Sequence, residues 1–64
     1  MTKAQELITE AIETLIPADT KYFDYVMGLL DMAAELEAIT ETEKAELTAA
    51  ASNALCEKLR AEKN

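Results

Sequence analysis

Histidine is absent from this 64-residue sequence, and cysteine occurs only once, at Cys56. A single thiol cannot form a disulfide within the chain, and without histidine or a second cysteine no thiolate or imidazole set is present to hold a metal. A core of this size rarely supplies more than about 3–5 kcal/mol of stability. Helix packing and association with another chain therefore remain as the means of stabilisation.

Glycine and proline also occur only once each, at Gly28 and Pro17. Together with abundant alanine, glutamate, leucine and lysine, this composition favours helix almost throughout. We expect one all-α domain over residues 1–64, folded as a small antiparallel three-helix bundle or a helical hairpin and associating as a dimer. The predicted helices span about residues 3–16, 20–38 and 41–61.

Capping signals and the proline set these boundaries. Thr2 with Gln5, and Thr40 with Glu43, have the spacing of capping boxes that begin the first and third helices. Pro17 ends the first helix because its nitrogen cannot donate a hydrogen bond. Asp19 or Thr20 then caps the second helix.

Basic residues are few. Six lysines and arginines face 13 acidic residues, the formal net charge is -7, and no basic residue occurs from Tyr22 to Glu43. Such a charge repels DNA and anionic membrane surfaces, so we expect no direct nucleic-acid binding and no membrane binding. No apolar run approaches the roughly 20 residues of a membrane span, and the N-terminal segment lacks the apolar core of a signal peptide. We expect a cytoplasmic protein.

The first and third predicted helices each have one apolar side. At about 100° per residue, one half of the first helix is apolar and the other half polar. The apolar half consists of Ala4, Leu7, Ile8, Ala11, Ile12, Leu15 and Ile16, which we expect to face the core. The stripe of the third helix is narrower and consists of Leu47, Ala51, Leu55 and Leu59. Cys56 lies near the edge of this stripe, where we expect it to pack as a small apolar side chain.

The second predicted helix differs because it is apolar nearly all round. Its strongly polar arc contains only Asp24, Asp31 and Glu35, with Gly28 beside them and Glu37 near the C-terminal end. A helix with this pattern is normally buried on most sides. Two neighbours from the same chain cannot cover it, so we expect a second copy of the chain to cover the remainder.

Positions on the second helix separate into two groups. Phe23, Val26, Met27 and Leu30 are expected to meet the other two helices. The predicted partner-binding residues are apolar Tyr25, Leu29, Met32 and Leu36, with an acidic rim of Asp24, Asp31, Glu35 and Glu37.

The motifs of common catalytic and ligand sites are missing from the sequence. There is no glycine-rich phosphate loop, no calcium-loop pattern and no nucleophile with an adjacent base. We therefore expect no enzyme activity, no catalytic or metal site, no cofactor and no small-molecule substrate.

Two hypotheses on function follow. The first is a non-enzymatic protein–protein interaction module, homodimeric, that presents the apolar face of the second helix within its acidic rim. The alternative is an acidic inhibitor, of the kind that phages and mobile elements use against restriction or CRISPR nucleases, which imitates nucleic acid and blocks a basic channel.

Overall fold

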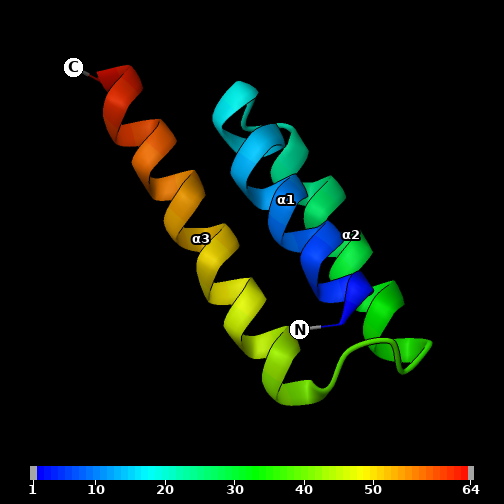
Figure 1. The fold of residues 1–64 in the computed structure, drawn as a ribbon. Helices are drawn as coiled ribbons and strands as arrows, with labels where there is room; N and C mark the ends of the chain where they lie inside the picture. Colours follow the sequence, from blue (N-terminus) through cyan, green and yellow to red (C-terminus); the bar gives the residue numbers. More distant parts are fainter. Residues whose placement is uncertain (1, 64) are drawn as a thin grey trace.

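Three helices make up the protein, as seen in a computed structural model that describes residues 2–63 (Figure 1). They are α1 (Lys3–Ala18), α2 (Tyr22–Glu35) and α3 (Glu41–Lys63). Consecutive helices run in opposite directions, and each helix contacts both others. The predicted all-α fold is confirmed. Because α1 and α3 also touch, the arrangement is a bundle and not an extended hairpin.

Buried side chains spaced three or four residues apart on each helix form the core. On α1 these residues are Ile8, Ile12 and Ile16, spaced four residues apart so that they lie on one face. The other helices and the second corner complete the core with Val26, Leu30, Ala33, Ile39, Leu47 and Ala51. Every fully buried side chain among residues 2–63 is apolar. The fold is therefore held by hydrophobic packing.

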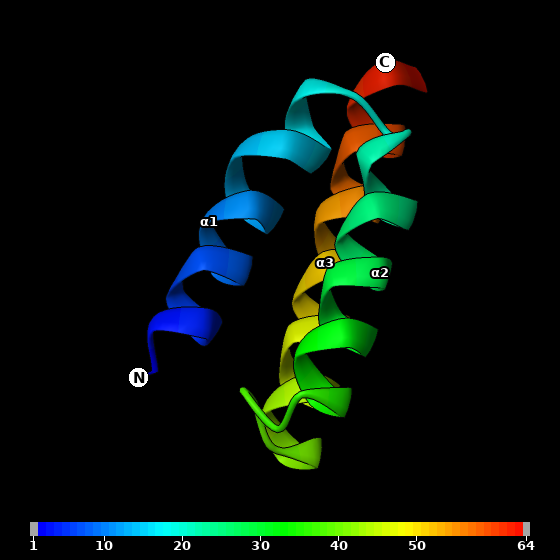
Figure 2. The ribbon, with the colours of Figure 1, turned by 90° about the vertical axis from the view of Figure 1, so that its right-hand side faces the viewer.

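The spacing between α1 and the other helices changes along its length. Ile16, near the C-terminal end of α1, has no solvent exposure. Toward its N-terminus α1 diverges from α2 and α3 (Figure 2). Near that end Leu7 is exposed and Ala4 is only partly buried. The bundle is thus closed at the first corner and more open at the other end.

The prediction that α1 ends at residue 16 is wrong. The helix continues through Pro17 to Ala18, and the Asp19 amide donates a hydrogen bond to the Leu15 carbonyl oxygen at 3.1 Å. Proline removes the donor that would pair with the carbonyl of Glu13. Both Pro17 and Glu13 are exposed, so water can replace that donor and the last turn survives.

The α2 boundaries also differ from the predicted 20–38. Thr20 and Lys21 form a turn in which the Lys21 amide donates to Asp19 Oδ1 at 3.0 Å, and the helix begins at Tyr22. At the other end α2 stops at Glu35, because Glu37 has a left-handed φ of 59°. The Ala38 amide donates to the Ala33 carbonyl at 2.8 Å, and the Glu37 amide donates to that of Ala34 at 3.1 Å. These two bonds form a Schellman motif that ends the helix three residues early.

The starts of α1 and α3 are capped as the sequence predicts. The Thr40 amide donates to Glu43 Oε1 at 2.8 Å, and the Glu43 amide donates to Thr40 Oγ1 at 3.1 Å, which confirms the capping box of α3. Thr2 Oγ1 accepts a hydrogen bond from the Gln5 amide at 3.2 Å. α3 runs two residues beyond its predicted end at 61.

Replacing Glu37 with glycine is expected to stabilise the fold by about 1 kcal/mol, because a side chain at positive φ is strained and glycine is not. The matched control is Glu35→Gly. It removes the same charge, but from a right-handed helical position, and should cost up to about 1 kcal/mol. Urea unfolding followed by circular dichroism measures both changes. Equal destabilisation by the two variants would contradict the left-handed conformation at Glu37.

Gly28 gives a second stability test on α2. A Cβ atom placed on Gly28 would meet no atom within 4 Å, so no helix crossing in the bundle requires glycine there. Gly28→Ala is therefore expected to raise the free energy of unfolding by about 1 kcal/mol through helix propensity alone. A loss of stability in the same urea assay would show that another molecule or helix packs closely against this position.

Candidate functional site

The predicted apolar partner-binding residues lie at the surface of α2. Tyr25, Met32 and Leu36 are 56%, 61% and 72% exposed, whereas Leu29 is half-buried. Positions 25, 29, 32 and 36 follow the helical repeat and form one continuous stripe, which we call the α2 stripe. On the side that faces the core, Val26 and Leu30 are buried, as predicted. The three helices of the chain do not cover the α2 stripe.

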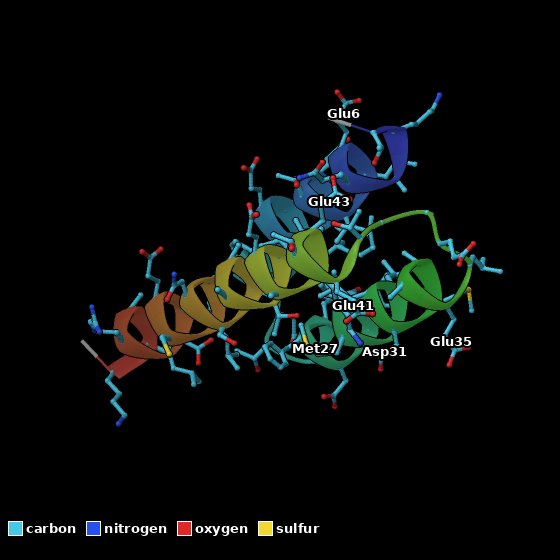
Figure 3. All side chains as sticks on the ribbon, turned by 90° about the horizontal axis from the view of Figure 1, so that it is seen from below. Glu6, Met27, Asp31, Glu35, Glu41 and Glu43 are labelled. Atoms are coloured by element: carbon cyan, nitrogen blue, oxygen red, sulfur yellow. The ribbon has the colours of Figure 1, made fainter. Side chains whose placement is uncertain are left out.

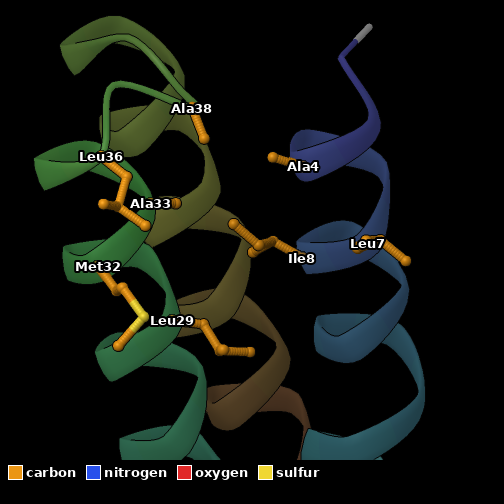
Figure 4. Close-up of a pocket in the computed structure, with 8 residues that line it drawn as sticks. All are labelled: Ala4, Leu7, Ile8, Leu29, Met32, Ala33, Leu36 and Ala38. Carbon is orange, nitrogen blue, oxygen red and sulfur yellow. The ribbon is translucent and has the colours of Figure 1, made fainter.

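An apolar groove lies between this stripe and the N-terminal half of α1 (Figure 4). Its volume is about 260 Å³, and every residue that lines it is apolar. Ile8 projects from α1 toward α2, and Leu29 projects from α2 toward α1. The remaining lining residues are Ala4, Leu7, Met32, Ala33, Leu36 and Ala38. The groove forms where α1 diverges from α2.

Leu7 was predicted to face the core, and this prediction is wrong. Its side chain is 58% exposed, and it lines the outer α1 edge of the groove. Leu7 lies about 100° from Ile8 around the helix, at the margin of the apolar half, where the diverging α1 leaves it uncovered. The periodicity of the sequence therefore did not predict that α1, as well as α2, contributes to the exposed apolar surface.

The acidic rim residues Asp24, Asp31, Glu35 and Glu37 are all exposed. Figure 3 shows the Glu35 side chain pointing away from the bundle. Asp31 differs from the others because its Oδ1 atom lies 3.1 Å from Lys44 Nζ, an ion pair that joins α2 to α3. The hydrogen bond to the Asp31 carboxylate raises the pKa of Lys44. The ion pair reduces the negative charge of the rim on the α3 side of α2.

Charge is divided unequally between the helices. Residues 3–40, which include α1, α2 and both corners, contain eight acidic and two basic residues. α3 contains five acidic and four basic residues. The exposed apolar groove therefore lies in the strongly anionic part of the molecule, whereas α3 is close to neutral.

Among residues 2–63, no group of three or more histidine, cysteine, aspartate or glutamate side chains could hold a metal ion. Cys56 is exposed, which contradicts the expectation that it packs as a small apolar side chain, because it lies on the side of α3 away from Leu47 and Ala51. None of the described helices is both long enough and apolar enough to cross a membrane.

The exposure of the α2 stripe predicts different costs for truncating Leu30, within α2, and Leu36, at its C-cap. Leu30 is 1% exposed, so Leu30→Ala should destabilise the fold by about 2–5 kcal/mol. Leu36→Ala, at a 72% exposed position, should change the free energy of unfolding by less than about 0.5 kcal/mol. Thermal or urea unfolding of dilute protein measures both. A large loss with Leu36→Ala would mean that Leu36 is covered in solution.

Comparison with known proteins does not connect the chain to a family. No protein-family model, curated protein or solved structure matches it. The surface of the bundle itself is therefore what bears on function.

Proposed function

We propose that this protein is a small, non-enzymatic interaction module that binds a protein partner through the α2 stripe and the adjoining groove. The observation that carries the proposal is the exposure of Tyr25, Met32 and Leu36 along one side of α2 and its C-cap. Isolated apolar residues are normal on protein surfaces, but a continuous apolar stripe beside an apolar groove is typical of an interface. An apolar centre within a polar, charged rim is also the usual composition of such interfaces.

A second copy of the chain is one candidate to cover this surface. A two-fold contact would place the α2 stripes of two copies together and bury the exposed apolar side chains on both. It would also supply the additional stabilisation that a core of this size needs. The opposing cost is repulsion between two anionic surfaces, which salt screens. Dimerisation through this surface should therefore strengthen as the salt concentration rises.

A second candidate function is mimicry of nucleic acid by an inhibitor that blocks a basic channel. The concentration of carboxylates in residues 3–40 favours it. Two features of the surface oppose it: an apolar stripe adjoins the acidic residues, and Lys44 pairs with Asp31. Binding by mimicry would weaken steeply with salt and survive loss of an apolar side chain, whereas binding through the α2 stripe would not survive that loss.

The test is substitution of Leu36 by glutamate, which places a charge at the most exposed point of the α2 stripe. We expect Leu36→Glu to weaken self-association or partner binding by at least about 10-fold, because a charge would be buried in the interface. Sedimentation at micromolar concentration, at low and high salt, measures self-association. Affinity capture from the native host, with identification by mass spectrometry, measures binding to other proteins.

Ala49→Glu is the matched control, because it adds the same charge at an exposed position on α3, outside the stripe. It should leave sedimentation and capture unchanged. The proposal fails if the protein is monomeric at every salt concentration and Leu36→Glu captures the same proteins as the unaltered chain.

A further inference from the structure

Carboxylates border the apolar groove on both sides. On α2, Asp24 and Glu35 lie in line with Gly28 and next to the α2 stripe, and all three positions are exposed. On α1, Glu10 follows Leu7 by three residues and is also exposed, so it lies on the outer side of Leu7. Lys3, one turn before Leu7, is the one basic residue of α1. A ligand in the groove would therefore have an apolar floor beneath it and mainly negative charge at its sides.

The shape of the groove suits a helix. It lies between two antiparallel helices, and on the α2 side it is lined by residues from Leu29 to Ala38. Tyr25 continues the α2 stripe by one more turn of the helix. A helix in this position would pack against α1 and α2 as a fourth member of the bundle. Its apolar side chains, spaced three and four residues apart, would face Leu29, Met32 and Leu36.

We infer that the groove binds a cationic amphipathic helix of another protein, with an apolar face toward the floor and lysine or arginine on its flanks. This inference rests on the proposed interaction function and names its partner by chemistry. The apolar face would supply affinity, and basic flanks would meet Glu10 on one border and Asp24 and Glu35 on the other. Lipid and nucleic-acid surfaces fit poorly, because their phosphates would approach carboxylates.

A second copy of the chain fits this groove less well than a basic helix. In a two-fold contact the same surface is used twice, so the borders of one copy would face the identical borders of the other. Residues 3–40 of each copy, which include α1 and α2, contribute eight acidic residues against two basic ones. Like charges brought together across an interface suppress association, whereas complementary charges favour it.

The test uses two synthetic peptides of about 16 residues, long enough to match α2 as a helix. Both carry leucine at the same three- and four-residue spacing, and they differ only in flanking residues, lysine in one and glutamate in the other. Calorimetric titration into the full chain gives the dissociation constants. We expect the lysine peptide to bind at least about 10-fold more tightly, and this ratio to shrink when salt is raised from about 0.05 M to about 0.5 M.

Charge-neutralising variants locate the contact. A variant with Glu10→Gln, Asp24→Asn and Glu35→Gln removes the carboxylates of the two borders and should weaken binding of the lysine peptide about 10-fold. Glu46→Gln is the control, because Glu46 is exposed on α3, away from the groove. It should leave the dissociation constant within about twofold, since a distant exposed charge is largely screened.

Equal binding of the two peptides, with loss of both in Leu36→Glu, would overturn the inference about partner charge and leave the proposed interaction surface standing. Failure of both peptides to bind also overturns it. In that case a dimer that Leu36→Glu dissociates would show that a second copy fills the groove, so the proposed function would survive. A monomer that Leu36→Glu does not affect, with no peptide bound, would count against both proposals.

Discussion

Contact among three helices lets each helix bury only one face, and this limit determines both the fold and its exposed surface. Ile16, Val26 and Ala51, one from each helix, have no solvent exposure at all. The sequences of α1 and α3 each have about one apolar face, so packing in the bundle covers most of their apolar side chains. α2 has apolar residues on more of its circumference. What α1 and α3 do not cover stays at the surface as the α2 stripe.

The sequence predicts the number and order of the helices well because the capping chemistry is local. Thr40 and Glu43 have to satisfy backbone groups within three residues of each other, so their spacing alone identifies the start of α3. The ends of α1 and α2 are less predictable. Whether Pro17 stops a helix depends on whether water reaches the freed carbonyl. The end of α2 depends on Glu37 adopting a conformation that glycine normally occupies.

The surface is only partly predictable for a similar reason. Periodicity separates Val26 and Leu30 from Tyr25, Met32 and Leu36, because these residues lie on α2 or at its C-cap and follow one helical repeat. The exposure of Leu7 depends instead on how α1 diverges from α2, which is a property of the packed bundle. Likewise, the ion pair of Asp31 with Lys44 joins two helices, and no local pattern places those two side chains 3.1 Å apart.

The unequal division of charge between the α1–α2 half and α3 makes the molecule an electric dipole. Near a positively charged object, such a dipole experiences a torque that turns its anionic half forward before any contact is made. Productive collisions then form a larger share of all collisions. The dipole therefore raises the association rate and does not lengthen the lifetime of the complex. The groove between α1 and α2 belongs to the half that this rotation presents first.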